Sequence, residues 1–300
     1  MTENVKGTGS AQSRAGSHFK NYVGLVPFLV ITSIFLIYPT ISVLFGAFQN
    51  PKGAWDSSIF TTVLNDPITR HAFANSLKLS FITATSGSIL GGLFAWALVT
   101  GKEGGYFYRF SVALSSVLAQ FGGVMLTFAF LATFGFNGVV STIAVKHFPD
   151  SFLAQSAWLY NLSGVAVVYT FFQIPLMVIV FLPTIQNMRP QWREASDSLG
   201  GGTLEFWRRV GIPVLTPSFI GAALLLFVNS FSAYATAATL VNVTGFLTTL
   251  QIAAALTSEV GGANPAEAKA LSLLMVAVVT LAMILYTLIR KRVSKWESTR

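Results

Sequence analysis

Six long apolar stretches constrain the fold of this chain more than any other feature of its sequence. They cover residues 22–48, 76–99, 110–135, 158–182, 216–240 and 268–289. A helix needs about 20 mostly apolar residues to cross a bilayer, so each stretch is long enough to do so. Only 10% of the residues are charged, whereas a soluble domain carries about a quarter. The sequence therefore predicts an all-α, polytopic membrane protein with six transmembrane helices.

The positions of the basic residues predict how these helices are oriented. Fourteen of the 19 Lys and Arg residues lie in the two tails and in the loops that follow the second and fourth stretches. The other side carries five: Lys52, Arg70, Lys78, Lys146 and Lys269. Basic loops stay in the cytoplasm, and an even number of spans puts both ends of the chain on one side. Both termini are therefore expected to be cytoplasmic.

The polar segments predict the boundaries of the domain. Residues 1–21 are expected to form a flexible cytoplasmic tail, residues 22–289 the transmembrane domain, and residues 290–300 a basic cytoplasmic C-terminus. Residues 137–157 and 241–265 are only moderately hydrophobic, and each could hold a short interfacial or re-entrant helix. The chain has no cysteine, which excludes disulfides and thiolate metal sites.

Catalytic and metal-binding motifs are missing from the sequence. It contains no phosphate-binding P-loop, no H-E-x-x-H zinc motif and no G-x-S-x-G nucleophile motif. We therefore expect no catalytic residue, no bound metal and no cofactor in this chain. All 11 carboxylates lie in tails, in loops or at the edges of the stretches. Ion-driven transporters usually need ionisable groups within the membrane, so this chain is not expected to be one. If it moves a solute uphill, the energy would come from a partner.

The loop between the fourth and fifth stretches, residues 189–213, carries the most specific pattern. Pro190 suits the first turn of a short helix, and Gly200 can end that helix in the left-handed conformation. A second short helix is expected to start at Thr203, whose hydroxyl can cap free N–H groups, and to end at Pro213. Two such helices would lie across the inner face of the membrane and offer apolar side chains to a partner groove. The side chains on offer are Trp192, Leu199, Leu204, Phe206 and Trp207.

The same loop resembles the signature of the membrane-spanning permease subunit of binding-protein-dependent ABC importers. That signature reads E-A-A, three residues, G, nine residues, I-x-L-P. The first half is matched by Glu194, Ala195, Ser196 and Gly200. The second half is matched, after nine residues, by Val210, Gly211, Ile212 and Pro213. The departures are Ser for Ala, Val for Ile and Ile for Leu, which keep similar volumes. The alternative is a helix pair that only anchors the loop to lipid headgroups.

This resemblance implies a role in coupling rather than in catalysis. In such importers the motif helices dock into a cleft on a cytoplasmic ATPase subunit, so the chain itself would not be an enzyme, and ATP and Mg²⁺ would be bound by the ATPase. The implied partners are two ATPase subunits, a second permease subunit, an extracytoplasmic solute-binding protein and the lipid bilayer, and no nucleic acid. The implied location is a bacterial inner or plasma membrane. The residues expected to couple to the ATPase are Arg193, Glu194, Ala195, Ser196, Gly200, Val210, Ile212 and Pro213.

Small and polar residues within the stretches indicate how the helices pack and where a solute could pass. Gly87-x-x-x-Gly91 provides a small-residue face on which another helix can approach closely. Amide and hydroxyl groups inside a membrane must face other helices or a wet pathway. For each of them, a hydrogen bond between helices is favoured over contact with a solute. The pathway candidates are Gln120, Gln173, Asn229, Ser232 and Tyr234.

The substrate class follows from resemblance alone. The fifth-stretch residues 229–234 and the compact first outer loop look most similar to permeases of the spermidine/putrescine group, so a polyamine is the expected substrate. Aminophosphonate, sulfate, ferric ion and sugar are the alternatives within this family. The lack of acidic residues inside the stretches weighs against a cation, which would have to pass over aromatic faces and carbonyl groups. A stand-alone channel or facilitator is the alternative outside the family.

Overall fold

The described part of the chain is helical and contains no β-strand. The computed structural model describes residues 25–49, 54–56, 58–101, 104–154, 156–241, 245–257 and 264–297. In these ranges six helical segments are long and apolar enough to cross a membrane. They are Val26–Gly46, Pro67–Thr100, Val124–His147, Leu162–Gln186, Thr203–Ser232 and Pro265–Leu288. The prediction of an all-α fold with six candidate spans is confirmed, and the expected tail over residues 1–21 lies outside the described residues.

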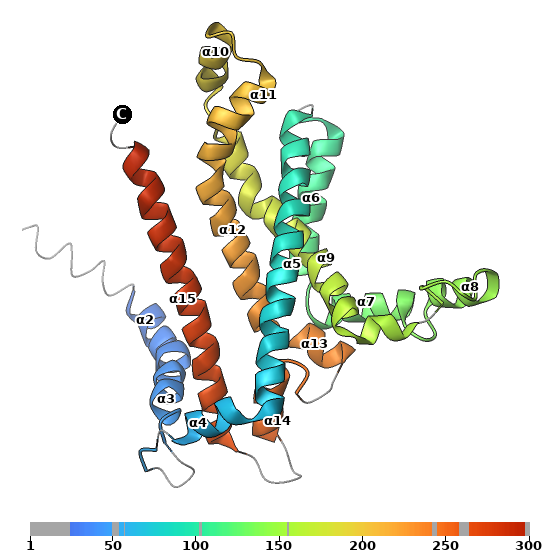
Figure 1. Cartoon of the computed structure of the whole chain (residues 1–300), viewed down its shortest axis with the longest axis vertical. Coiled ribbons are helices and arrows are strands. Elements are labelled where there is room, and N and C mark those ends of the chain that lie inside the picture. The colour runs from blue at the N-terminus through green and yellow to red at the C-terminus, as the bar shows by residue number, and fades with distance from the viewer. Residues whose placement is uncertain are drawn as a thin grey trace, which may run out of the picture.

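Three long helices form the centre of the bundle (Figure 1): α5 (Pro67–Thr100), α9 (Leu162–Gln186) and α12 (Ile212–Ser232). Helix α5 approaches α9 closely because glycine has no side chain. A Cβ atom on Gly91 would lie 2.6 Å from the carbonyl oxygen of Ile174, and one on Gly87 would lie 2.7 Å from Cβ of Gln173. The predicted small-residue face is therefore the surface on which α9 packs.

The two ends of the bundle carry different short elements (Figure 1). At one end lie α10 (Pro190–Ser198), α11 (Thr203–Phe206), the start of α6 (Tyr106–Gln120) and the C-terminal end of α15 (Pro265–Glu297). At the other end lie α4 (Ser58–Asn65) and α14 (Thr248–Thr257). The stretches richest in basic residues thus gather at the α10 end. That this end faces the cytoplasm remains a prediction from the charge distribution.

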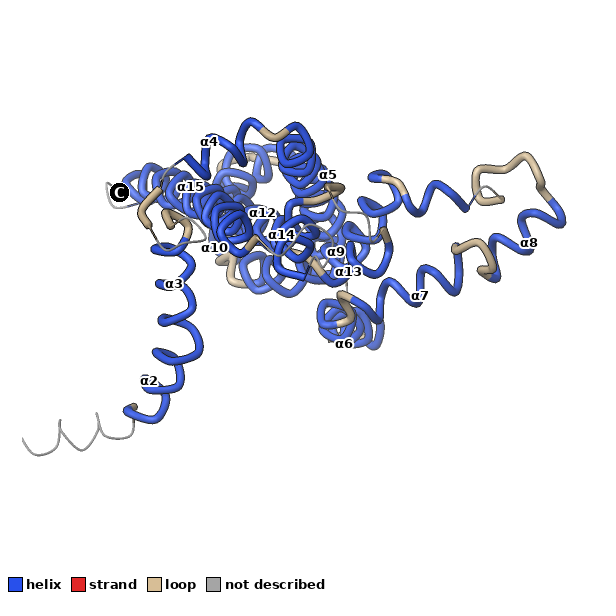
Figure 2. The backbone as a smooth tube through the Cα atoms, turned by 90° about the horizontal axis from the view of Figure 1, so that it is seen from below, coloured by secondary structure: helices blue, strands red, loops and turns tan. Residues whose placement is uncertain are grey.

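The first span stands away from the rest of the bundle. It consists of α2 (Val26–Thr32), a π-helical segment η1 (Ser33–Ile37) and α3 (Tyr38–Gly46). Only α3 has extensive packing with another described element, the C-terminal helix α15. Figure 2 shows α2 extending sideways from the bundle, and its large apolar side chains are exposed.

The prediction of one helix over 110–135, made from the third apolar stretch, is wrong in its boundaries. Helix α6 ends at Gln120, and α7 (Val124–Phe134) starts after a turn in which Gly123 has a φ of +68°. A glycine adopts this left-handed conformation without steric cost, so the chain turns sharply between two apolar helices. Helices α7 and α8 (Val139–His147) then run sideways from the bundle (Figures 1 and 2). Helix α8 is the short helix that residues 137–157 were expected to hold, as α14 is for residues 241–265.

The fourth and fifth stretches also differ from their expected limits. Residues Ser156–Tyr160 form a 3₁₀ turn before α9 starts at Leu162. The fifth stretch, predicted over 216–240, is divided, because α12 ends at Ser232 and α13 (Ala235–Leu240) follows a bend. At this bend the backbone of Ala233 is extended, with a ψ of 115°, and its carbonyl oxygen accepts a hydrogen bond of 2.9 Å from the Tyr169 hydroxyl.

Two of the prolines within the described spans are each preceded by a π-helical segment. Pro39 follows η1, and Pro213 follows η3 (Trp207–Gly211). In both cases the residue before the proline donates its N–H to the carbonyl five residues earlier: Tyr38 to Ser33, and Ile212 to Trp207. Proline would clash with the carbonyl four residues before it in a regular helix, and the wider π turn relieves this. The expectation that Pro213 ends the second short helix is therefore wrong, because the helix runs on from Thr203 through Pro213 to Ser232.

Candidate coupling site

Helix α10 has the start and the end that its sequence predicts. Pro190 occupies the first turn, where its missing N–H leaves no hydrogen bond unmade. Gly200 has a φ of +77°. The N–H of Gly201 bonds to the Ser196 carbonyl at 2.9 Å, and the N–H of Gly200 bonds to the Asp197 carbonyl at 3.0 Å. This pair of bonds is the Schellman motif, so Gly200 ends the helix in the left-handed conformation, as expected.

Helix α11 starts at Thr203, as predicted, but the threonine hydroxyl does not cap it. The capping position is held by Gly202, which makes no side-chain cap. The Thr203 hydroxyl oxygen instead accepts a hydrogen bond of 2.8 Å from the Arg193 guanidinium. The side chain expected to close its own helix therefore connects that helix to α10.

Arg193 is the centre of contacts between the two short helices. Its Nε lies 3.1 Å from both carboxylate oxygens of Asp197, one turn further along α10. Its guanidinium carbon also lies 5.3 Å from the centre of the Phe206 ring, within the range of cation–π attraction. We call the unit formed by residues 190–211 the coupling hairpin, after the role that its sequence predicts. Arg193 holds it closed by joining α10 to both ends of α11.

The apolar side chains of the coupling hairpin fall into two groups. Leu199 and Leu204 are 88% and 82% exposed and flank the connection between α10 and α11, which we call the tip of the hairpin. Figure 1 shows α10 and α11 extending beyond the ends of the other helices. Phe206 is only 5% exposed, and Trp192 and Trp207 are half-buried. The expectation that all five are offered to a partner is wrong for Phe206, because the ring packs inside the hairpin.

The two halves of the sequence motif lie on different elements. Glu194, Ala195, Ser196 and Gly200 belong to α10 or its end, with Glu194 and Ala195 exposed and Ser196 half-buried. Val210 lies in the π-helical segment η3, and Ile212 and Pro213 start α12, where both are exposed. The motif therefore covers α10 and the junction between η3 and α12.

The pathway candidates differ in their exposure, because one is buried and four are exposed. Gln173 is fully buried and donates a hydrogen bond of 2.9 Å to the Thr83 hydroxyl, which lies 2.8 Å from the Ser230 hydroxyl. This network joins α9, α5 and α12, so Gln173 follows the interhelical interpretation. Thr83 was not identified from the sequence, because a single threonine in a span carries no distinctive signal. The remaining candidates are exposed: Gln120, Asn229, Ser232 and Tyr234.

A second polar cluster lies at the opposite end of the bundle and was also missed. Gln251 on α14 donates a hydrogen bond of 2.6 Å to the Thr69 hydroxyl, and Thr69 donates one of 2.7 Å to Asp66. Asp66 caps the N-terminus of α5. The hydrogen bonds from the Thr69 side chain and backbone lower the pKa of the Asp66 carboxyl below its ordinary value. The cluster therefore fixes α14 against the start of the second span.

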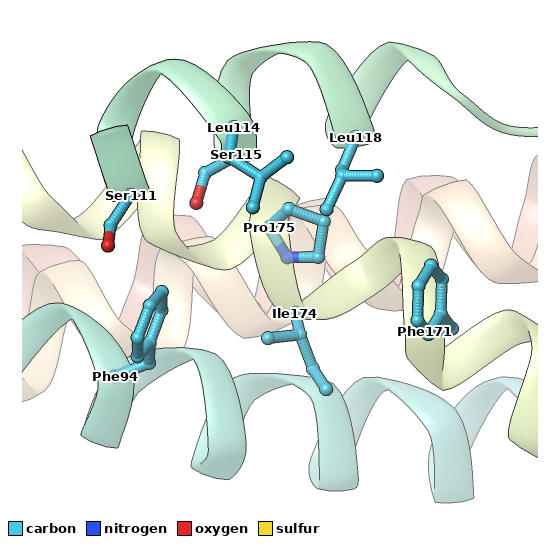
Figure 3. Close-up of a pocket in the computed structure, with 8 residues that line it drawn as sticks. All are labelled: Phe94, Ser111, Leu114, Ser115, Leu118, Phe171, Ile174 and Pro175. Atoms are coloured by element: carbon cyan, nitrogen blue, oxygen red, sulfur yellow. The ribbon is translucent and has the colours of Figure 1, made fainter. Parts of the chain in front are cut away.

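An apolar cavity of about 160 Å³ lies between α5, α6 and α9 (Figure 3). Phe94 borders it from α5, Leu114 from α6, and Phe171 from α9. Two serines of α6, Ser111 and Ser115, are the polar side chains in its lining. Among the described residues, no three histidine or acidic side chains come together in a way that could hold a metal ion.

Sequence comparison finds relatives among importer permeases, and no family model matches the chain. The sulfate transport system permease protein CysT of Salmonella typhimurium is 28% identical over 175 residues, which cover 57% of this chain and 59% of that protein. CysT of Escherichia coli K12 is 25% identical over the same shares of the two chains. The match thus spans less than two thirds of these relatives. The spermidine/putrescine permease PotC homolog of Mycoplasma genitalium is 35% identical, but over only 63 residues and 22% of its length.

Solved structures share the fold over most of the chain. A bacterial ABC transporter that imports the acidic polysaccharide alginate matches with a TM-score of 0.71 and 15% identity, over 93% of this chain and 96% of the other. The methionine ABC transporter MetNI, in an inward-facing conformation, matches with a TM-score of 0.57 and 15% identity, over 74% of this chain and 94% of the other. At such identities the likeness establishes the fold. The chain is similar in sequence to ABC importer permeases and has their membrane-spanning fold.

Proposed function

We propose that this chain is a permease subunit of an ABC importer, and that it transmits the work of a cytoplasmic ATPase through the coupling hairpin. The observation that carries this proposal is the hairpin itself. It extends beyond one end of the bundle, Arg193 closes it, and it exposes Leu199 and Leu204 at its tip. Two exposed leucines on a rigid pair of short helices fit a groove on a partner. The sequence relatives and the fold support the same role.

We further propose that the solute is sulfate or a related oxyanion rather than a polyamine. The longest sequence matches are to sulfate permeases, whereas the spermidine/putrescine match covers 21% of the chain. The charge distribution in the spans agrees. Carboxylates of the described spans lie near their ends, as Glu205 and Glu267 do, so a polyamine would meet no negative charge on its way. Hydroxyl and amide groups can donate hydrogen bonds to an anion.

The partners of such a subunit are part of the proposal. They are two ATPase subunits that bind ATP and Mg²⁺, a second permease subunit, and an extracytoplasmic solute-binding protein, in a bacterial inner or plasma membrane. The first span supports a second membrane subunit. Its most apolar window has no buried residue in the described part of the chain, and a span that packs so little against its own chain gains further packing only from lipid or from another protein chain.

The test of coupling is purification and uptake. A tagged form of this chain, produced in a cell that carries the neighbouring genes, should bring down an ATPase and a second permease-like chain. Glu194→Lys should leave the chain folded and abolish ATP-dependent uptake, because Glu194 lies exposed on α10. The proposal fails if the chain purifies alone, or if Glu194→Lys leaves uptake unchanged. Proteoliposomes that contain only this chain would show solute flux if it were a stand-alone channel.

The test of substrate uses labelled solutes. Cells that lack their own sulfate importer should accumulate radioactive sulfate when they express the assembled complex, and unlabelled spermidine should not compete. Uptake of spermidine without uptake of sulfate would overturn the oxyanion proposal and would support the polyamine as substrate. Uptake of aminophosphonate, ferric ion or sugar alone would also overturn it, and would leave the coupling role standing.

A further inference from the structure

We infer that Trp96, near the end of α5, is a positioning residue for the coupling hairpin. With Trp207 and Phe206 it forms a row of aromatic rings that ties Arg193 to the second span. A movement of α10 would then reach α5 through side chains, as well as α12 through the backbone. This inference rests on the proposed function, because it concerns how the coupling hairpin passes on the movement of an ATPase.

The row of rings is continuous. The Arg193 guanidinium lies over the Phe206 ring at 5.3 Å. The rings of Phe206 and Trp207 meet edge to face, with centroids 5.7 Å apart and planes at 73°. Trp207 meets Trp96 in the same manner, at 6.0 Å and 78°. These separations lie in the range of 4.5–7 Å in which aromatic pairs attract one another.

Gly211 provides the space in which the Trp207 ring lies. A Cβ atom on Gly211 would be 2.5 Å from Cε3 of Trp207 and 3.0 Å from Cζ3. These are atoms of a rigid ring rather than the end of a flexible chain, so any side chain at position 211 would push the ring away. Gly211 stands at the variable position of the sequence motif, yet in this chain the packing of Trp207 requires a glycine there.

The backbone between α10 and α11 is a poor lever by itself. The connection contains Gly200, Gly201 and Gly202 in succession, and glycine restricts the backbone least of all residues. A displacement of α10 would bend this connection unless side chains carried it across. From Trp207 onward the path is stiff, because η3 continues into α12 and Trp96 is part of the 34-residue helix α5. The side chains from Arg193 to Trp96 bridge the compliant connection.

The first test measures amide hydrogen exchange in the purified chain in lipid nanodiscs. Trp96→Leu should raise the rate of amide exchange in residues 190–206 about two- to tenfold, which is the effect expected from the loss of one aromatic pair. Trp96→Phe keeps a ring and should restore most of the protection. The matched control is Leu93→Ala, which shortens an exposed apolar side chain on the same helix and should change nothing in the hairpin. Unchanged exchange in Trp96→Leu would overturn the inference.

A double-mutant cycle guards against a variant that disturbs α5 itself. Gly211→Ala displaces Trp207 without altering α5, and should raise hairpin exchange by a similar factor. If both variants break the same row of rings, the combined variant should exchange no faster than the more affected single one. Effects that multiply would mean that Trp96 and Trp207 act independently, and would overturn the inference.

The second test separates this inference from the proposed function. In the assembled complex, Trp96→Leu should still purify with the ATPase, because Leu199 and Leu204 at the tip are unaltered. Radioactive sulfate taken up per ATP hydrolysed should fall at least threefold, with Trp96→Phe close to the unaltered chain. If the Trp96→Leu complex takes up as much sulfate per ATP as the unaltered complex, the inference is overturned and the proposed function is unaffected. An unaltered chain that binds no ATPase would sink the proposed function.

Discussion

Arg193 and Thr203, ten residues apart, are joined by a hydrogen bond of 2.8 Å across a connection of three glycines. The bond runs from a guanidinium on α10 to the first residue of α11. Because Arg193 also contacts Asp197 and the Phe206 ring, one side chain determines how the two short helices face each other. The shape of the surface offered to a partner therefore depends on Arg193 more than on any residue at the tip.

Replacing Arg193 with alanine should open the coupling hairpin. Its bonds are partly exposed, so we expect a local loss of about 1 kcal/mol rather than unfolding of the bundle. Chymotrypsin cleavage at the buried Phe206 should become about fivefold faster. Arg209→Ala is the control, because the ion pair of Arg209 with Glu205 is exposed and lies within the continuous helix Thr203–Ser232, without involving α10. Equal cleavage of the two variants would contradict the role of Arg193.

At Gly200 there is space for a side chain, but the backbone conformation disfavours one. A Cβ atom there would meet nothing within 4 Å, yet its φ is +77°. Gly200→Ala should therefore weaken the end of α10 by about 1 kcal/mol, and Gly200→Asn by less. The control is Gly202→Ser, because position 202 has an ordinary φ of −79° and also opens onto free space. Amide exchange at positions 200 and 201 measures the change. Unchanged exchange in Gly200→Ala would show that the Schellman bonds are not needed.

The apolar stretches predict the number of helices well and their breaks poorly. Hydropathy does not reveal the turn between α6 and α7, because both helices are apolar and the two glycines at 122 and 123 lower the average only slightly. The glycine pair was nevertheless a readable signal for a turn. The break at Ala233 had no such signal, because it depends on a hydrogen bond from Tyr169, 64 residues away. A local stretch of sequence shows how apolar a helix is, but it does not show which distant residues contact the helix where it ends.

The coupling hairpin shows the same limit at the level of single residues. Pro190 and Gly200 act through the backbone, and their positions in α10 follow from general rules for helix ends. The roles of Thr203 and Phe206 depend on where Arg193 lies, which no spacing rule specifies. The continuation of the helix through Pro213 depends on a π turn, and the residues 207–211 that form it have no composition that predicts it.

The glycines of α5 should differ sharply in their tolerance of alanine. A Cβ on Gly91 would meet the Ile174 carbonyl and Met177 Cβ, both at 2.6 Å, so α9 as a whole would have to move. A Cβ on Gly92 would meet the edge of the Phe219 ring at 2.9 Å, which can shift. We expect Gly91→Ala to cost about 2 kcal/mol and Gly92→Ala less than about 1 kcal/mol. Thermal melting in detergent would show this, and the opposite order would refute it.

Asp66 should make the stability of the chain depend on pH. Hydrogen bonds from Thr69 lower the pKa of its carboxyl in the folded state. A lowered pKa means that the contribution is fully present above the ordinary value of 3.8 and is lost as the pH falls through the folded value. Melting temperatures between pH 6 and pH 2 should fall less in Asp66→Asn, which keeps a cap, than in the unaltered chain. Asp66→Ala should lose about 1 kcal/mol at neutral pH, and identical pH profiles would contradict the assignment.

Thr83 should matter more to stability than Gln173, although Gln173 is the larger residue of the network. The Gln173 amide oxygen is buried and has no hydrogen-bond partner among the described residues, so Gln173→Leu removes an unpaired group while Thr83 keeps its contact with Ser230. Thr83→Val leaves both the Gln173 amide and the Ser230 hydroxyl without their shared partner, at a cost of about 1 kcal/mol. Melting in detergent should therefore show Gln173→Leu near neutral and Thr83→Val destabilised. A Gln173→Leu variant that melts normally but transports a changed set of solutes would instead place Gln173 on the pathway.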